Sequence, residues 1–356
     1  MNQPPAPFSC TYNPQLPELL FNLKCTIAIS TYQAGKVVFI SAADDQRLVQ
    51  LPRNFIGAMG IALSNDKMAI ATKNEVVVLK NVPALAPTYP KKPDTYDALF
   101  MPRATYYTGQ VDVHDLHYGD RGLYAVNTSF SCLSLINDDY SFEPIWKPGF
   151  ITEYASEDRC HLNGLAMDGN KPKYISGLGC SNTPQGWREN ITNGGILMDI
   201  ETGDLVLDRV PMPHSPRIYD GKLYMLLSAT GELVEADVNT GKYTLIHKLK
   251  GFARGMAKHG DYLFIGLSKL RQNSSTFRHL PIALDAKEAG IVVIHLPTGG
   301  IVGQITYQAS VDEIYDVQII PDSIRPGIIN TEGIEHKLGL SIPDATYWAV
   351  QPPPKE

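Results

Sequence analysis

The sequence predicts a single six-bladed β-propeller, on the basis of its composition, a repeated two-strand pattern and complementary strands at the two ends. The chain has 356 residues, with 29 Gly, 26 Pro and 18 Tyr. This composition is typical of many short strands and turns rather than of long helices. Hydrophobic residues make up 44% of the chain, enough for a sizeable core.

The main observation is a repeated pattern of a small or polar residue, an apolar strand, a tight turn and a second apolar strand. Its copies begin at Gly60, Asp115, Gly164, Pro216, Gly255 and, in a weaker form, Asp316. They recur roughly every 40 to 60 residues, which is the period expected of four-stranded propeller blades. The pairs Asn65-Asp66 and Asp220-Gly221 are among the turn residues that favour hairpins.

A second pattern keeps phase with the first. DIETGDLV, ADVNTGKYT and IHLPTGGIVG follow three of the hairpins, with turn glycines at Gly203, Gly241 and Gly299. Each predicts an apolar strand, a Thr-Gly turn and an outer strand. Two patterns in phase indicate complete blades rather than unrelated hairpins.

The two ends of the chain predict how the ring closes. TIAIST, KVVFISA and RLVQLPR near the N-terminus form three strands without an inner partner, and EIYDVQII near the C-terminus supplies an inner strand. Joining them completes a sixth blade and removes an exposed edge. We therefore expect one propeller domain over residues 1–356, with an N-terminal extension at 1–24 and a C-terminal tail at 345–356.

Charge and cysteine content limit the class of protein. The net charge of −6 gives no reason to expect a nucleic-acid partner. No segment approaches the roughly 20 apolar residues of a membrane span, and the N-terminus does not look like an export signal, so a cytoplasmic protein is expected. The five cysteines have no paired spacing, which argues against a disulfide framework and a cysteine-based zinc site.

The residues just before each repeat carry the candidate site, because the first strand of every blade lines the central channel. Three of them are histidines at similar but not identical positions: His114, His161 and His214. Arg254 aligns with His114. The same strands carry Asn163, Arg217 and Glu313.

Three imidazoles and a carboxylate from separate strands are a ligand set suited to Zn, Fe, Mn or Cu, softer metals than calcium. We expect His114, His161 and His214 to be metal ligands, and Glu313 to be a fourth ligand or a general base. Asp112, Asp115 and Asp158 would fix the imidazole tautomers.

Arg217 and Arg254 would hold a substrate carboxylate or phosphate. Two loops, with Lys269 and Arg271 in one and Trp187 and Arg188 in the other, would complete an anion-binding rim together with Asn163.

This site predicts a metal-dependent enzyme that acts on a carboxylate-bearing small molecule or a peptide, by oxidation, hydrolysis or isomerisation. The alternative is a non-catalytic propeller that binds an anionic ligand or peptide, with the histidines as polar lining. A third possibility is a metal-free enzyme in which His114 or His161 is an acid or base. Glycine-rich phosphate loops, HExxH and G-x-S-x-G are absent.

Several longer motifs add a resemblance. STYQAGKV, HDLH with YAVNTSFSCLS, EDRCHLNGLA, MPHSPR, FARG and GLSK-x-R occur along the chain. They resemble a family of uncharacterised bacterial propeller-like proteins of about this length. The resemblance covers nearly the whole chain and implies a propeller, without implying a reaction.

Overall fold

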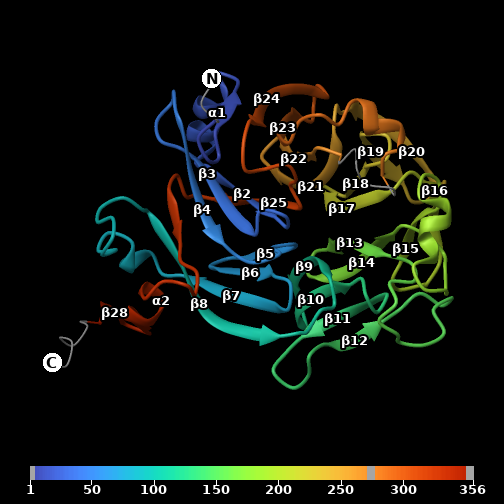
Figure 1. Cartoon of the computed structure of the whole chain (residues 1–356), viewed down its shortest axis with the longest axis horizontal. Helices are drawn as coiled ribbons and strands as arrows, with labels where there is room; N and C mark the ends of the chain where they lie inside the picture. Colours follow the sequence, from blue (N-terminus) through green and yellow to red (C-terminus); the bar gives the residue numbers. More distant parts are fainter. Residues whose placement is uncertain (1–4, 271–276, 350–356) are drawn as a thin grey trace.

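The computed structural model describes residues 5–270 and 277–349 and shows a six-bladed β-propeller. The blades are antiparallel sheets arranged around a central axis (Figure 1). Each inner strand contacts the inner strands of both neighbouring blades, so the ring is continuous at its centre. The all-β class and the number of blades predicted from the sequence are confirmed.

In each blade the strands follow one another from the centre of the ring outward. The closing blade consists of β25 (Asp316–Pro321), β2 (Cys25–Thr31), β3 (Lys36–Ala42) and β4 (Leu48–Asn54). Blade 2 consists of β5 (Ile61–Ser64), β6 (Lys67–Ala71), β7 (Glu75–Asn81) and β8 (Ala98–Tyr107). Blade 3 consists of β9 (Val113–Gly119), β10 (Gly122–Asn127), β11 (Cys132–Ile136) and β12 (Glu143–Trp146).

The other three blades have the same arrangement. Blade 4 consists of β13 (Leu162–Asp168), β14 (Lys171–Gly177), β15 (Gly195–Asp199) and β16 (Leu205–Val210). Blade 5 consists of β17 (Pro213–Tyr219), β18 (Lys222–Leu227), β19 (Glu232–Asp237) and β20 (Lys242–Lys248). Blade 6 consists of β21 (Phe252–His259), β22 (Tyr262–Ser268), β23 (Gly290–His295) and β24 (Gly300–Tyr307).

The closing blade joins both ends of the chain, as predicted. Its inner strand β25 pairs antiparallel with β2, with Val317 opposite Ile29. The weak repeat copy at Asp316 is only half a hairpin, however. Its second part, β26 (Pro326–Ile328), does not return along β25 but pairs in parallel with β8 of blade 2. The chain therefore also ties the closing blade to its neighbour.

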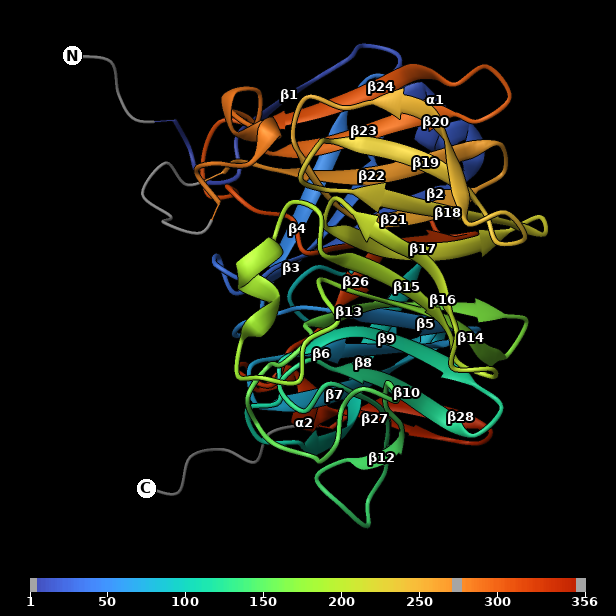
Figure 2. The same ribbon diagram turned by 90° about the vertical axis from the view of Figure 1, so that its right-hand side faces the viewer.

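Both terminal segments pack on the outside of the ring. β1 (Cys10–Tyr12) pairs with β24, and α1 (Leu16–Leu23) buries Leu16 and Leu20 completely. At the other end, α2 (Glu335–Leu338) leads into a hairpin of β27 (Gly339–Ile342) and β28 (Ala345–Trp348). The hairpin lies outside blade 2 (Figure 1 and Figure 2). Within residues 5–270 and 277–349, no helix is long and apolar enough to cross a membrane.

The apolar core lies between neighbouring blades. Strands in the middle of a blade are buried on both faces; all seven residues of β2 are buried, for example. Outer strands such as β20 are largely exposed. Alternate residues of each strand face opposite neighbours, so every blade contributes to two layers of core. This packing keeps the inner strands at fixed positions around the axis.

Glycines at the start of the repeat allow the inner strands to approach closely. A Cβ atom on Gly164 would lie 2.4 Å from Cδ of Pro216 in the next blade, and one on Gly60 would lie 3.0 Å from the backbone of Asp115. At Gly255, which has a φ of +77°, it would lie 2.6 Å from the backbone nitrogen of Val317. The repeated glycine thus marks contacts between blades as well as strand starts.

A buried arginine connects the inner strands across the axis. Arg217 of β17 donates from Nη1 to Oδ2 of Asp115 at 2.8 Å and from Nη2 to Oδ1 at 3.1 Å. Its Nη1 also donates to the carbonyl oxygen of Leu165 in β13, and Nη2 lies 4.0 Å from Oδ1 of Asp316 in β25. Oδ2 of Asp316 in turn accepts the N–H of Ile61 in β5 at 2.9 Å. One guanidinium and two carboxylates therefore link the inner strands of five blades.

The two carboxyl groups in this cluster differ in their tendency to ionise, because their pKa values are shifted in opposite directions. Burial by itself raises the pKa of Asp115, but the charges of Arg217 and His117 outweigh it and hold that pKa below its usual range. Burial and the negative charge of Asp115 raise the pKa of Asp316. The bidentate Arg217–Asp115 pair is therefore the charged core of the cluster.

Replacing Arg217 by methionine is expected to lower the free energy of unfolding by about 3–5 kcal/mol, because two buried carboxylates lose their counter-charge. Urea denaturation followed by circular dichroism measures the change. Arg209→Met is the matched control, since Arg209 is highly exposed. Equal stability of the two variants would contradict a stabilising role for the cluster.

Gly164→Ala tests the close approach of blades 4 and 5. The added methyl group meets the rigid Pro216 ring, so we expect a loss of about 1–3 kcal/mol in the same denaturation experiment. Gly149→Ala is the control, because no heavy atom lies within 4 Å of the Cβ position there. A Gly164→Ala protein as stable as wild type would show that the ring can widen at this point.

Candidate functional site

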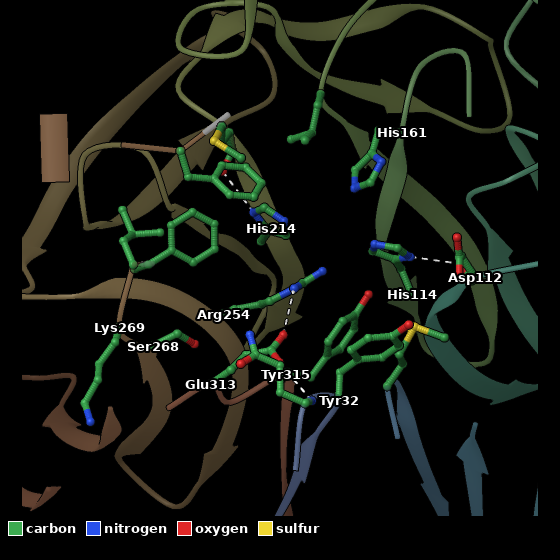
Figure 3. Close-up of a pocket in the computed structure, with 17 residues that line it drawn as sticks. Tyr32, Asp112, His114, His161, His214, Arg254, Ser268, Lys269, Glu313 and Tyr315 are labelled. Carbon is green, nitrogen blue, oxygen red and sulfur yellow. Dashed lines mark hydrogen bonds and ion pairs between the residues drawn. The ribbon is translucent and has the colours of Figure 1, made fainter. Parts of the chain in front are cut away.

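A cavity of about 550 Å³ opens at one mouth of the channel, where the inner strands of the propeller begin (Figure 3). Its volume lies in the range of about 300–1,000 Å³ that is common for small-molecule sites. Its polar lining residues are Tyr32, Gln33, Asp112, His114, His161, His214, Arg254, Ser268, Lys269, Glu313 and Tyr315. The cavity thus brings together seven residues selected from the sequence: the three histidines, Asp112, Arg254, Lys269 and Glu313.

The ring of His114 is held by its own strand and by the next blade. A left-handed φ of 49° at Asp112 turns the chain, so that Nδ1 of His114 lies 3.0 Å from the Asp112 carbonyl oxygen. Nδ1 is also 2.7 Å from Oγ1 of Thr128. The Thr128 hydroxyl donates to the carbonyl of Leu162 in blade 4, so Nδ1 is the donor to Thr128. Nε2 therefore carries the lone pair, and Figure 3 shows that it points into the cavity.

His214 repeats this arrangement two blades further on. Met212 has a φ of 53°, and Nδ1 of His214 lies 3.1 Å from the Met212 carbonyl oxygen and 2.8 Å from Oγ of Ser228. The Ser228 hydroxyl donates to the carbonyl of Ala253 in blade 6. Nδ1 is again the N–H donor, and Nε2 faces the cavity as an acceptor.

His161 is oriented by a carboxylate instead. Its Nδ1 lies 2.8 Å and 3.0 Å from the two oxygens of Asp158, in a turn where both residues have φ near 50°. Trp187, in the short 3₁₀ helix η2 (Gly186–Asn190), donates from Nε1 to Asp158 at 2.9 Å. The Trp187 ring also packs on the imidazole, with 4.4 Å between centroids. His161 is therefore fixed with Nε2 towards the cavity.

The imidazoles of His114 and His214 lie in an environment that favours the neutral form. His114 and His161 meet edge to face, with 4.8 Å between ring centroids. Burial, followed by the charges of His161 and Arg254, places the pKa of His114 well below its usual value. Burial and the charge of Arg254 have the same effect on the pKa of His214. Both rings therefore present an unprotonated Nε2 at neutral pH.

Arg254 is the main cation of the cavity wall. Its guanidinium carbon lies 3.6 Å from the ring centroid of Tyr315, and its Nη1 lies 3.7 Å from Oε1 of Glu313. Glu313 also accepts the backbone N–H of Gln33 at 3.2 Å. Among the described residues, no hydrogen-bond acceptor is found for the Arg254 guanidinium. Lys269, in contrast, pairs with Asp312 at 2.6 Å.

One side of the cavity is apolar. Leu178, Met212, Phe252, Leu270 and Phe277 line it and belong to one hydrophobic cluster between blades 4, 5 and 6. The ring of Phe252 also packs against His214, with 5.8 Å between centroids. The cavity therefore has an apolar wall, an imidazole side and a charged Arg254–Glu313 pair.

The donor types suit a transition metal, but their arrangement is looser than a metal site requires. Within residues 5–270 and 277–349, no group of three or more His, Cys, Asp or Glu side chains is arranged to hold a metal ion. Glu313 is engaged with Arg254 and Gln33. The four residues expected as ligands share the cavity without forming a ready coordination sphere.

Comparison with models of protein families shows which family the chain belongs to. A family model described as a domain of unknown function (DUF4915) matches residues 14–329. The chain belongs to this family. No curated protein is significantly similar to it in sequence.

Solved structures resemble the chain in fold. A chain in the crystal structure of a nidogen/laminin complex superposes with a TM-score of 0.54 at 8% identity, covering 84% of this chain and 99% of that one. The Pan2 WD40 domain of Neurospora crassa gives a TM-score of 0.40 at 12% identity, covering 69% of this chain and 64% of that one. At this identity, the nidogen/laminin match shows the propeller fold alone.

The remaining residues selected from the sequence do not line the cavity. Arg217 lies in the buried ion cluster, and Asn163 is buried with its Oδ1 accepting from Ser176 at 2.7 Å. Trp187 supports His161 from behind, and the Arg188 guanidinium lies 4.3 Å from the Trp187 ring centroid. Arg271 falls outside the described residues.

Sequence reasoning missed the hydroxyls that orient the rings and the apolar wall. One signal was available, because Thr128 and Ser228 each follow their histidine by 14 residues. The same spacing separates Arg254 from Ser268, whose hydroxyl donates to Ile314 of the closing blade. The apolar wall had no such signal, because its residues look like ordinary core in the sequence.

Proposed function

We propose that the cavity binds a small molecule that carries a carboxylate or another anionic group, with Arg254 as its principal partner. The observation that carries this proposal is the state of the Arg254 side chain, which is 15% exposed, stacked on Tyr315 and without a hydrogen-bond acceptor among the described residues. A guanidinium presents a planar fork of donors that matches a carboxylate, and partial burial strengthens such a pair. Its charge is only partly balanced, because Glu313 lies beyond hydrogen-bond distance.

The surroundings fit a small ligand. Nε2 of His114 and of His214 would accept hydrogen bonds from hydroxyl or N–H groups. Burying the rest of the ligand against the apolar wall would contribute roughly 25 cal/mol per Å² of apolar area removed from water. The proposal covers both a purely binding protein and an enzyme whose substrate is a carboxylic acid.

Binding of 3-phenylpropionate, which combines a carboxylate with an apolar ring, tests the proposal by isothermal titration calorimetry. We expect Arg254→Met to raise its dissociation constant about 10- to 150-fold, because a charge-assisted bidentate contact is lost. Arg121→Met makes the same change at an exposed turn and is expected to bind as wild type does. Equal binding by the Arg254 and Arg121 variants would contradict the proposal.

A second candidate is a metal-dependent enzyme, favoured by the shared orientation of the three imidazoles. A histidine that ligates a metal usually donates its other ring N–H to a carbonyl or carboxylate, as His114, His161 and His214 all do. These residues, with Glu313, would hold Fe, Mn, Cu or Zn. Such a metal would supply Lewis acidity for hydrolysis or isomerisation, and Fe, Mn or Cu would supply redox chemistry for an oxidation with dioxygen as the oxidant. Arg254 would orient the substrate carboxylate, and Lys269 would add positive charge at the rim.

The metal content of protein purified without an affinity tag or chelator tests this second candidate. Near-stoichiometric Fe, Mn, Cu or Zn is expected in the wild type and after reconstitution, with loss in folded His114→Ala and His161→Ala variants. His295→Ala, outside the cavity, should retain the metal. A wild type that stays metal-free after reconstitution would exclude the metalloenzyme and leave the binding function in place.

A further inference from the structure

Arg254 is not a lone cation in the cavity wall, because it lies beside Glu313 as a pair of opposite charges. Nη1 of Arg254 and Oε1 of Glu313 are 3.7 Å apart, which is too far for a good hydrogen bond, and the side chains are 15% and 14% exposed. Each is held from behind, Arg254 by the Tyr315 ring and Glu313 by the Gln33 backbone N–H. Figure 3 shows both at the same side of the cavity. A ligand with neighbouring opposite charges would bind to both.

The imidazole side adds acceptor nitrogens, and the Asp112 side chain beside His114 also lines the cavity. Nε2 of His114 and of His214 faces the cavity without a proton, because Nδ1 is the donor in each ring. Three donors on a ligand ammonium group would be shared between Glu313 and such nitrogens. A ligand with only anionic groups would leave Glu313 facing like charge, which disfavours binding.

The apolar wall requires an apolar part in the same ligand. Leu178, Met212 and Phe252 are buried residues of one cluster, and they line the same cavity as His161 and the charged pair. An apolar wall of this kind selects an aliphatic or aromatic group by burial and excludes a charged one by desolvation.

We infer that the ligand is a free α-amino acid with an apolar or aromatic side chain. Its carboxylate would pair with Arg254, its ammonium with Glu313, and its side chain would contact the apolar wall. The two charged groups of an α-amino acid are attached to one carbon, which matches the close spacing of the Arg254–Glu313 pair. An N-terminal peptide residue lacks the carboxylate and a C-terminal one lacks the ammonium. This inference rests on the proposed anion site and adds the substrate class.

A ligand series measured by calorimetry on the full-length protein tests each contact separately. L-phenylalanine and L-leucine are expected to bind at least about tenfold more tightly than N-acetyl-L-phenylalanine, L-phenylalanine amide and glycine, because each of these lacks one charged or apolar contact. 3-Phenylpropionate, which has no ammonium group, serves as the reference for the anion site alone.

A variant pair then assigns the ammonium contact. Glu313→Gln should weaken L-phenylalanine about tenfold and leave 3-phenylpropionate unchanged or tighter, because a negative charge beside the carboxylate is removed. Glu201→Gln, at a side chain that is 80% exposed, is the control and should alter neither. Circular dichroism confirms that the variants are folded.

The outcomes separate this inference from the anion site. If 3-phenylpropionate binds through Arg254 and L-phenylalanine binds no better, the amino-acid assignment is wrong while the anion site stands. If Glu313→Gln weakens both ligands equally, Glu313 holds Arg254 in place and does not contact an ammonium group. If neither ligand binds the wild type, both the proposed function and this inference fail.

Discussion

The buried pairing of Arg217 with Asp115 is the interaction on which the centre of the propeller depends. A guanidinium at the axis is stable only when carboxylates and carbonyls satisfy its donors, and in this ring they come from the inner strands of neighbouring blades. Asp316 extends the cluster to the closing blade and, through Ile61, to blade 2. The starts of these strands carry the cavity residues, so the ion cluster also fixes where those residues lie.

Hydroxyl groups link this framework to the site. Thr128 and Ser228 each accept from a histidine Nδ1 and donate to a carbonyl of the following blade, while Ser268 bridges blade 6 to the closing blade. Thr128 and Ser228 thus each stabilise an interface between blades and select the tautomer of one imidazole. The rings are oriented before any ligand arrives, and binding would cost little side-chain entropy.

The cavity differs from the rest of the channel because its charges are incompletely neutralised. Deeper in the ring, Arg217 donates hydrogen bonds to Asp115 and to backbone carbonyls, whereas at the mouth Arg254 lies 3.7 Å from Glu313 and has no hydrogen-bond acceptor among the described residues. The propeller fold alone does not explain this contrast, since the same fold carries many functions. It arises from particular side chains at the mouth, which makes that end of the channel the place to look for a ligand.

Sequence alone determined the six blades, the closure by both ends and the three histidines at strand starts, because turn residues, strand alternation and repeat phase are local properties of the chain. It did not distinguish Arg217 from Arg254, which occupy comparable places on inner strands. Nor did it decide whether the histidines and Glu313 come together in one cavity. Only the tertiary structure decided these points, because Asp115 lies 102 residues from Arg217 and the partners of each site residue come from other blades. Burial and charge pairing are set by neighbours in space, which the order of residues does not specify.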